Sequence, residues 1–184
     1  APAGLAEWAA AQPHGARVVI PGCGRAYEAA VLAHAGLAVT AIDIALQAVA
    51  AARTVLGEVR GVTLLQADFF APLPGEPFDL IYERAFACAL PPRLWPGWAA
   101  RCAELLAPGG RLAGYFLIDE GVDPANRRGP PFAVRRSELQ ALLEPHFALE
   151  EARATPDELA VLRGQLWMTW IRRSGEPTNP PAAL

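Results

Sequence analysis

The chain of 184 residues is 53% hydrophobic and carries a formal net charge of −3, with charges of both signs mixed along it. This length supports one domain with a substantial core, and the mixed charge excludes the basic surface that nucleic-acid binding requires, so we expect no nucleic-acid partner. All 16 basic residues are arginine, which excludes Schiff-base chemistry, attachment of pyridoxal phosphate and the lysine of a phosphate-binding P-loop.

The first half of the chain alternates short apolar runs with stretches rich in alanine and leucine. The apolar runs are typical of buried strands, and the alanine-rich stretches are typical of helices. In chain order we expect a strand at 17–21, a helix at 26–35, a strand at 38–43, a helix at 45–56 and strands at 62–66 and 78–82. This alternation predicts an α/β fold with a parallel, doubly wound sheet.

The second half continues the alternation and closes with two strands. We expect a helix at 94–106, a turn at 108–110, a strand at 111–117, a helix at 137–143 and strands at 147–154 and 165–172. The spacing of the last two strands allows an antiparallel hairpin at one edge of the sheet. Residues 1–173 are thus expected to form a single domain, and residues 174–184, with three prolines, a flexible tail.

Candidate ligand-binding residues follow the predicted strands, because open α/β sheets bind ligands beyond the carboxyl ends of their strands. Gly22 and Gly24 follow the first strand, where glycine permits a tight turn and a close approach of the backbone to a ligand. Tyr27 stands where a dinucleotide-binding loop has its third glycine, which disfavours NAD and leaves an NAD oxidoreductase as a minor alternative. Asp43 lies nineteen residues beyond Gly24, a spacing that suits an acceptor for ribose hydroxyls, the alternative being a helix cap.

The next two strand ends also carry polar groups. Asp68 precedes Phe69 and Phe70, so that an acceptor stands beside apolar rings that could flank an adenine; its alternative role is that of a turn residue. Glu83 and Arg84 follow the fourth strand, either as a surface ion pair or with the arginine binding a carboxylate. Together the four strand ends fit an adenosine with a short amino-acid tail better than a dinucleotide.

The sequence resembles the thiopurine methyltransferase family, and above all its plant-type halide and thiol methyltransferase branch. The resemblance runs from about Arg17 to Arg172 and rests on residues 19–25, 41–44, 66–70, 78–90, 105–110 and 129–132. It implies a Rossmann-like, seven-stranded sheet, mostly parallel with an antiparallel last strand, that binds S-adenosylmethionine. The implied cofactor-binding residues are Gly22, Cys23, Gly24, Asp43, Ile44, Ala67, Asp68, Phe69, Glu83 and Arg84.

The resemblance further implies transfer of a methyl group to a small soft nucleophile: a thiol, a halide or thiocyanate, or a selenium or tellurium oxyanion. An acceptor that is already anionic needs no general base, and we identify no catalytic residue. Candidate residues of the acceptor pocket are Phe86, Tyr115 and Arg128, the last in the loop 127–132. Two alternatives stay open, an O- or N-methyltransferase of a small metabolite and a non-catalytic module that binds S-adenosylmethionine.

The remaining features concern location and completeness. Cys23, Cys88 and Cys102 form no CxxC pair and have no histidine at ligand spacing, so we expect no metal and reduced thiols. No apolar stretch is long enough to span a membrane and no signal peptide is visible, so we expect a cytoplasmic protein. Nothing in the sequence requires a dimer, so we expect a monomer or a weak homodimer. Family members begin with a longer aromatic segment, whereas only Trp8 precedes the first strand. We expect either a trimmed sequence or a missing mobile lid. In both cases the sequence does not determine which segment covers the cofactor pocket.

Overall fold

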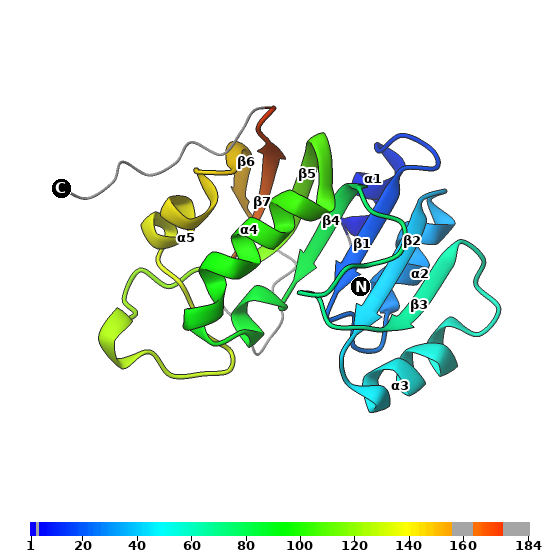
Figure 1. Cartoon of the computed structure of the whole chain (residues 1–184), viewed down its shortest axis with the longest axis horizontal. Helices are drawn as coiled ribbons and strands as arrows, with labels where there is room; N and C mark the ends of the chain where they lie inside the picture. Colours follow the sequence, from blue (N-terminus) through cyan, green and yellow to red (C-terminus); the bar gives the residue numbers. More distant parts are fainter. Residues whose placement is uncertain (3, 156–163, 175–184) are drawn as a thin grey trace.

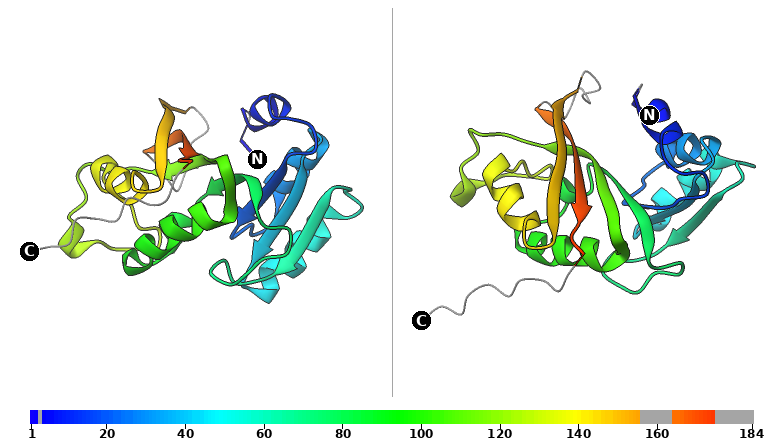
Figure 2. Two further views of the ribbon diagram at one scale, coloured as in Figure 1. Left: turned by 45° about the horizontal axis from the view of Figure 1, so that its top comes forward. Right: turned by 90° about the horizontal axis from the view of Figure 1, so that it is seen from above.

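The computed structural model of the chain has three layers, a central sheet with helices on both faces (Figures 1 and 2). It describes residues 1–2, 4–155 and 164–174. These residues form a seven-stranded sheet in the order β3-β2-β1-β4-β5-β7-β6. Strands β1 to β5 pair in parallel, whereas β7 runs antiparallel to both of its neighbours. The predicted fold class is therefore confirmed.

The strands and helices follow the predicted order closely. The strands are β1 (Arg17–Pro21), β2 (Ala38–Asp43), β3 (Val62–Gln66), β4 (Phe78–Arg84), β5 (Leu106–Leu117), β6 (Phe147–Ala154) and β7 (Gln165–Arg172). The α-helices are α1 (Leu5–Ala10), α2 (Tyr27–His34), α3 (Leu46–Leu56), α4 (Trp95–Leu105) and α5 (Arg136–Leu143). Short 3₁₀ helices occupy η1 (Ala87–Ala89), η2 (Pro92–Leu94) and η3 (Pro124–Asn126).

The two faces of the sheet bury different sets of side chains. On one face, α1, α2 and α3 cover a core that includes Leu32, Leu80 and Trp167. On the other face, α4 and α5 cover a core that includes Trp98 and Phe116. Side chains alternate between the faces along each strand, so neighbouring residues of β4 and β5 belong to different cores. This alternation decides where the residues at the end of β4 point.

Three local features differ from the sequence-based expectations. Helix α1 was not expected: a six-residue helix is marginal by itself, and burial of Leu5 and Ala9 against the sheet stabilises it. Strand β5 begins at Leu106 instead of residue 111, because Leu106 pairs with Phe78 before the register shifts. The expected turn at 108–110 lies within this irregular part of β5, where Gly109 has a φ of +76°.

The closing hairpin is confirmed. β6 and β7 pair antiparallel from Phe147 with Arg172 to Ala154 with Leu166, and β6 forms the edge of the sheet. The expected flexible tail lies outside the described residues, apart from Ser174. In the described part of the chain, every helix is too short or too polar to traverse a lipid bilayer.

Candidate active site

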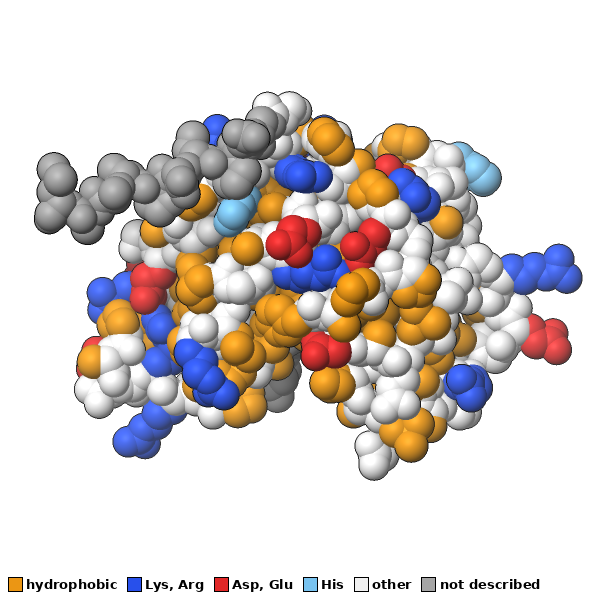
Figure 3. All heavy atoms as spheres, in the orientation of Figure 1, with side chains coloured by type: hydrophobic (Ala, Val, Ile, Leu, Met, Phe, Trp, Pro, Cys, Tyr) orange, Lys and Arg blue, Asp and Glu red, His pale blue; other side chains and the backbone are white. Residues whose placement is uncertain are grey.

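A cleft of about 280 Å³ opens beyond the carboxyl ends of β1, β2 and β3. It lies beside the point where the strand order reverses between β1 and β4, the usual place for a ligand in such sheets. The surface is notched at this edge of the sheet, and hydrophobic side chains border the notch (Figure 3). The cleft is lined by Gly22, Ile42, Asp43, Ile44, Ala67, Asp68, Phe69, Phe70, Phe86, Leu90 and Leu94. Every cofactor residue predicted from the first three strand ends is among them except Cys23 and Gly24.

The turn after β1 has the backbone that its glycines predict. Gly22 and Gly24 have φ values of +57° and +53°, in the left-handed region that favours glycine. A Cβ atom at Gly22 would approach the ring of Phe86 to 2.5 Å, so a side chain at this position would close one end of the cleft. Cys23 lies in this turn but is buried, and burial raises the pKa of its thiol to about 12, with the Asp43 carboxylate adding to the effect.

Asp43 fixes the turn as well as lining the cleft. Its Oδ2 atom accepts the Gly24 N–H at 3.0 Å, and its Oδ1 atom accepts the Ala45 N–H at 2.9 Å. Each carboxylate oxygen can accept more than one hydrogen bond, so both retain capacity for the hydroxyls of a ribose. The N-cap residue of α3 is Ala45, and Asp43, two residues earlier, bonds to the backbone N–H of that residue.

The end of β3 supplies an acceptor and aromatic rings. Asp68 Oδ1 accepts the Phe70 N–H at 3.0 Å, so the turn role is present, while the exposed side chain also lines the cleft. The Phe69 ring packs edge-on against the rings of Phe70 and Phe86, with centroids 5.2 and 5.1 Å away. This side of the cleft therefore offers apolar surface next to a carboxylate.

Arg84 and Glu83 point to opposite faces of the sheet. The Arg84 side chain is 9% exposed, its Nε atom lies 3.6 Å from Glu28 Oε1, and its guanidinium stacks over the Tyr115 ring at 4.4 Å. Glu28 lies in the first turn of α2, directly after the glycine turn. Arg84 is thus held beside the end of the cleft where the glycine turn lies.

Glu83 is 1% exposed and faces the core under α4. Its Oε1 atom accepts the backbone N–H groups of Phe86 at 2.8 Å and Ala87 at 3.1 Å. Burial raises the pKa of this carboxyl to about 7, against the lowering effect of the two N–H donors. Among the described residues, its Oε2 atom has no hydrogen-bond partner.

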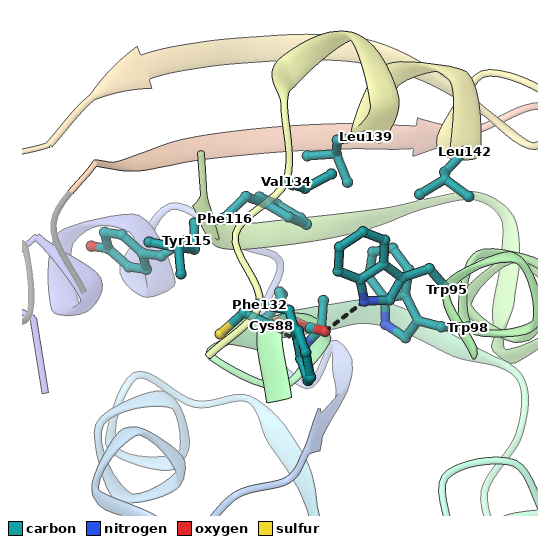
Figure 4. A pocket seen from close by; sticks show the side chains of 12 residues that line it. Cys88, Trp95, Trp98, Tyr115, Phe116, Phe132, Val134, Leu139 and Leu142 are labelled. Atoms are coloured by element: carbon teal, nitrogen blue, oxygen red, sulfur yellow. Dashed lines mark hydrogen bonds between the residues drawn. The ribbon is translucent and has the colours of Figure 1, made fainter. Parts of the chain in front are cut away.

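A small second cavity, of about 20 Å³, adjoins Glu83. The rings of Trp95, Trp98 and Phe132 gather around it in Figure 4. Its walls are formed by Glu83, Ala87, Cys88, Trp95, Trp98, Tyr115, Phe116, Leu117, Phe132, Val134, Leu139 and Leu142. The segment 86–90 stands between the two spaces, because Phe86 and Leu90 line the cleft whereas Ala87 and Cys88 line the cavity.

The three residues expected at the acceptor pocket lie in different places. Phe86 lines the cleft. Tyr115 belongs to the strand that walls the cavity, but its ring points away from the other labelled rings in Figure 4 and packs against Trp167 at 5.1 Å. Arg128 is exposed and does not line the cavity. The neighbouring Arg127 turns inward instead, stacking over the Trp95 ring at 4.8 Å and pairing with Glu138 at 2.6 Å.

The sequence analysis did not identify several residues of these two spaces, among them Trp95, Trp98 and Leu94. The spacing of the two tryptophans, three apart on one helix face, was the only available signal, and it is equally typical of a structural core. In the described residues no group of three or more histidine, cysteine or acidic side chains could hold a metal ion.

Comparison with solved structures places this fold among Rossmann-like methyltransferases. The 1,6-didemethyltoxoflavin-N1-methyltransferase of Burkholderia thailandensis, solved with S-adenosylhomocysteine, superposes with a TM-score of 0.72, covering 92% of this chain and 78% of that chain at 22% identity. At this identity the likeness concerns the fold alone. The class that the fold defines is therefore the Rossmann-like fold of class I methyltransferases.

Sequence comparison identifies the family within this class. The profile described as Thiopurine S-methyltransferase (TPMT) matches residues 5–171. Probable thiol methyltransferase 2 of Arabidopsis thaliana is 37% identical over 153 residues, 81% of this chain and 65% of that protein. Thiocyanate methyltransferase 1 of Brassica oleracea is 30% identical over 81% of this chain and 66% of its own length. The chain belongs to the thiopurine S-methyltransferase family, as its motifs predict, and spans slightly less than two thirds of these relatives.

Proposed function

We propose that this chain is an S-adenosylmethionine-dependent methyltransferase whose acceptor is a small soft nucleophile, a thiol above all. The observation that supports it is the adjacency of two spaces across the segment 86–90: a cleft with the Asp43 carboxylate at the strand ends, and a small, mostly apolar cavity. The first suits the cofactor and the second an acceptor. The relatives named for thiol and thiocyanate methylation give the same direction.

The cleft residues fit the cofactor group by group. Asp43 keeps acceptor capacity for the ribose, and Ala67, Asp68 and Phe69 offer an apolar face and an acceptor to an adenine. The turn at Gly22 leaves room for the amino-acid end, and Arg84 brings a positive charge to the same end. Cys23, Gly24 and Ile44 also belong to the predicted set, and the contact of each with the cofactor is part of the proposal. Glu83, the remaining predicted cofactor residue, lines the second cavity instead of the cleft.

The chemistry supplied by the bound cofactor is a sulfonium methyl group open to in-line attack. The protein's own residues would exclude water and hold the acceptor in line. The aromatic walls of the cavity serve the first purpose, since Trp95 and Trp98 are almost fully buried. The cysteines take no covalent part, because burial raises the pKa of the Cys23 and Cys88 thiols to about 12 and keeps them neutral.

Calorimetric titration with S-adenosylhomocysteine tests the cofactor site. We expect micromolar binding to the wild type and binding at least tenfold weaker, about 1.4 kcal/mol, in Asp43→Asn. The matched control is Asp79→Asn, because Asp79 accepts the Arg17 N–H at the opposite end of the sheet. It should bind as tightly as the wild type.

Methyl transfer is then measured with ethanethiol, thiocyanate and a small phenol. Transfer to sulfur acceptors supports the proposal, and transfer to the phenol alone supports the O-methyltransferase alternative. Tight binding of S-adenosylhomocysteine without turnover of any acceptor would favour a non-catalytic binding module. Equal binding by Asp43→Asn and the wild type would refute the assigned cofactor site.

We also propose that the protein works in the cytoplasm as a monomer or weak homodimer, on a small-molecule acceptor and without nucleic acid. The supporting features are three buried cysteines that form no disulfide in the described residues, and a net charge of −3. Sedimentation of the purified chain and fractionation of cells address these points.

A further inference from the structure

The cavity beside Glu83 contains two polar atoms that the fold leaves without partners. Glu83 Oε2 and Trp98 Nε1 are both buried, both belong to residues that line the cavity, and neither has a hydrogen-bond partner among the described residues. Buried polar groups are nearly always paired, with protein or with a bound molecule. An acceptor and a donor without partners thus belong to residues that wall a space for about one water-sized group, such as the S–H of a thiol.

The position of Glu83 is fixed by the backbone. The Phe86 and Ala87 N–H groups both bond to Oε1, which leaves Oε2 as the oxygen available to a ligand. The same two residues begin the segment that separates the cavity from the cleft. The free oxygen therefore lies on the acceptor side, close to the wall that both spaces share.

The other charged and titratable groups around the cavity do not neutralise Glu83. Cys88 of η1 and Cys102 of α4 are neutral, because burial raises the pKa of each thiol well above its ordinary value. Arg127 stacks on the outer tryptophan, Trp95, and pairs with Glu138 of α5. Arg84 points to the opposite face of the sheet, toward Glu28 and Tyr115.

We propose that Glu83 is a catalytic residue whose Oε2 atom takes the proton from a neutral thiol, and that this site therefore selects protonated thiols over halide and thiocyanate anions. The inference rests on the proposed methyltransferase function and specifies its acceptor. Trp98 Nε1 positions the thiol by donating to its sulfur.

The step is balanced without any further reactant. The S–H bond of the thiol breaks, and its proton passes to the Glu83 carboxylate. The electron pair of the thiol sulfur forms the new S–CH₃ bond, while the pair of the broken sulfonium S–CH₃ bond stays on S-adenosylhomocysteine. The Glu83 carboxylic acid then releases the proton to solvent after the products leave.

Electrostatics and acidity both favour a thiol. An ionised carboxylate in an apolar cavity repels an anion strongly, since charges interact more strongly where water is excluded. A pKa of about 7 for Glu83 lies about 3 units below that of an alkyl thiol such as ethanethiol, ~10, whereas an alkyl alcohol lies near water at about 16. Proton transfer from a thiol is therefore less unfavourable than from a hydroxyl, as efficient general-base catalysis requires.

The test compares Glu83→Gln with the wild type on one acceptor that carries a proton and one that does not. We expect the variant to lose about 100-fold or more in kcat/KM for ethanethiol at pH 7. For thiocyanate we expect kcat/KM to stay within about threefold or to rise, because the glutamine amide no longer repels an anion. The thiol deficit should shrink above about pH 10, where an alkyl thiol ionises by itself.

Two further variants control for structure. Glu150→Gln removes a hydrogen-bonded carboxylate outside both spaces, where Glu150 pairs with Arg111, and should leave kcat/KM unchanged for both acceptors. Glu83→Asp keeps the charge and should recover part of the thiol activity. Equal losses with ethanethiol and thiocyanate, or an unchanged thiol rate, would overturn the role of Glu83 while leaving the methyltransferase function intact. A wild type that methylates neither acceptor would instead refute the proposed function, and the inference with it.

Discussion

Glu83 should make the stability of this protein depend on pH in a direction opposite to that of most carboxylates. Burial raises the pKa of its carboxyl from 4.5 to about 7 in the folded state. Between these values the folded chain binds a proton that the unfolded chain has released, so stability falls as pH rises. At about 1.4 kcal/mol per pKa unit, the wild type loses about 3 kcal/mol between pH 4.5 and pH 8.

Glutamine at position 83 removes this loss. It resembles the protonated acid in shape and keeps an oxygen for the Phe86 and Ala87 N–H groups. Glu83→Gln should therefore match the wild type near pH 4.5 and exceed it by about 3 kcal/mol at pH 8, or about 10 °C in Tm for a chain of this size. Urea unfolding followed by tryptophan fluorescence at several pH values measures the difference.

Glu76 provides a control of opposite sign. The Arg101 side chain and the Leu73 N–H hold the pKa of Glu76 below its usual value, against the effect of burial. Its contribution to stability is present above the unfolded pKa and disappears as pH falls, so Glu76→Gln should weaken the fold at pH 8 and less so at pH 4. A wild type and a Glu83→Gln variant that differ by the same amount at every pH would refute the assigned burial of Glu83.

Two further substitutions test the frame of the site. Gly114→Ala should destabilise the protein by about 3 kcal/mol or more in a urea titration, because its Cβ atom would overlap the Glu83 carbonyl group of the neighbouring strand; normal stability would contradict the close approach of β4 and β5. Arg101→Ala should lower stability by about 3 kcal/mol and weaken S-adenosylhomocysteine binding in calorimetry, because Arg101 donates hydrogen bonds to the Phe69 and Ala71 carbonyls beside the cleft. Unchanged binding would show that these hydrogen bonds are not needed to keep the cleft wall in place.

The sequence was sufficient for the order of the elements and for most of the cofactor cleft. Buried parallel strands are continuous apolar runs, so β1, β2 and β4 could be located directly, and the spacing of the last two runs indicated the antiparallel hairpin. Because parallel strands end at one edge, residues such as Asp43 and Asp68 were expected together, and the structure places both at the cleft. Their contacts with the cofactor stay predictions that the calorimetry tests.

Other features depended on contacts between distant segments. Helix α1 needs burial against the sheet, and the early start of β5 depends on pairing of Leu106 with Phe78. Which arginine of the pair at 127 and 128 turns inward was set by Trp95 and Glu138, which lie on two other helices. The local sequence could not predict which of the two arginines turns inward, because Trp95 and Glu138 belong to other segments of the chain.

Glu83 and Arg84 show most directly what the sequence determines and what only the tertiary structure decides. The sequence indicated two opposite charges directly after the fourth strand at the ligand-binding edge, whereas β4 extends to Arg84 and includes both. Only the tertiary structure decided that they face opposite sides of the sheet, with Arg84 beside Glu28 and Glu83 under Trp98. The physical reason is that burial and pKa depend on what the other strands and helices pack around a side chain, which its immediate neighbours in the chain do not specify.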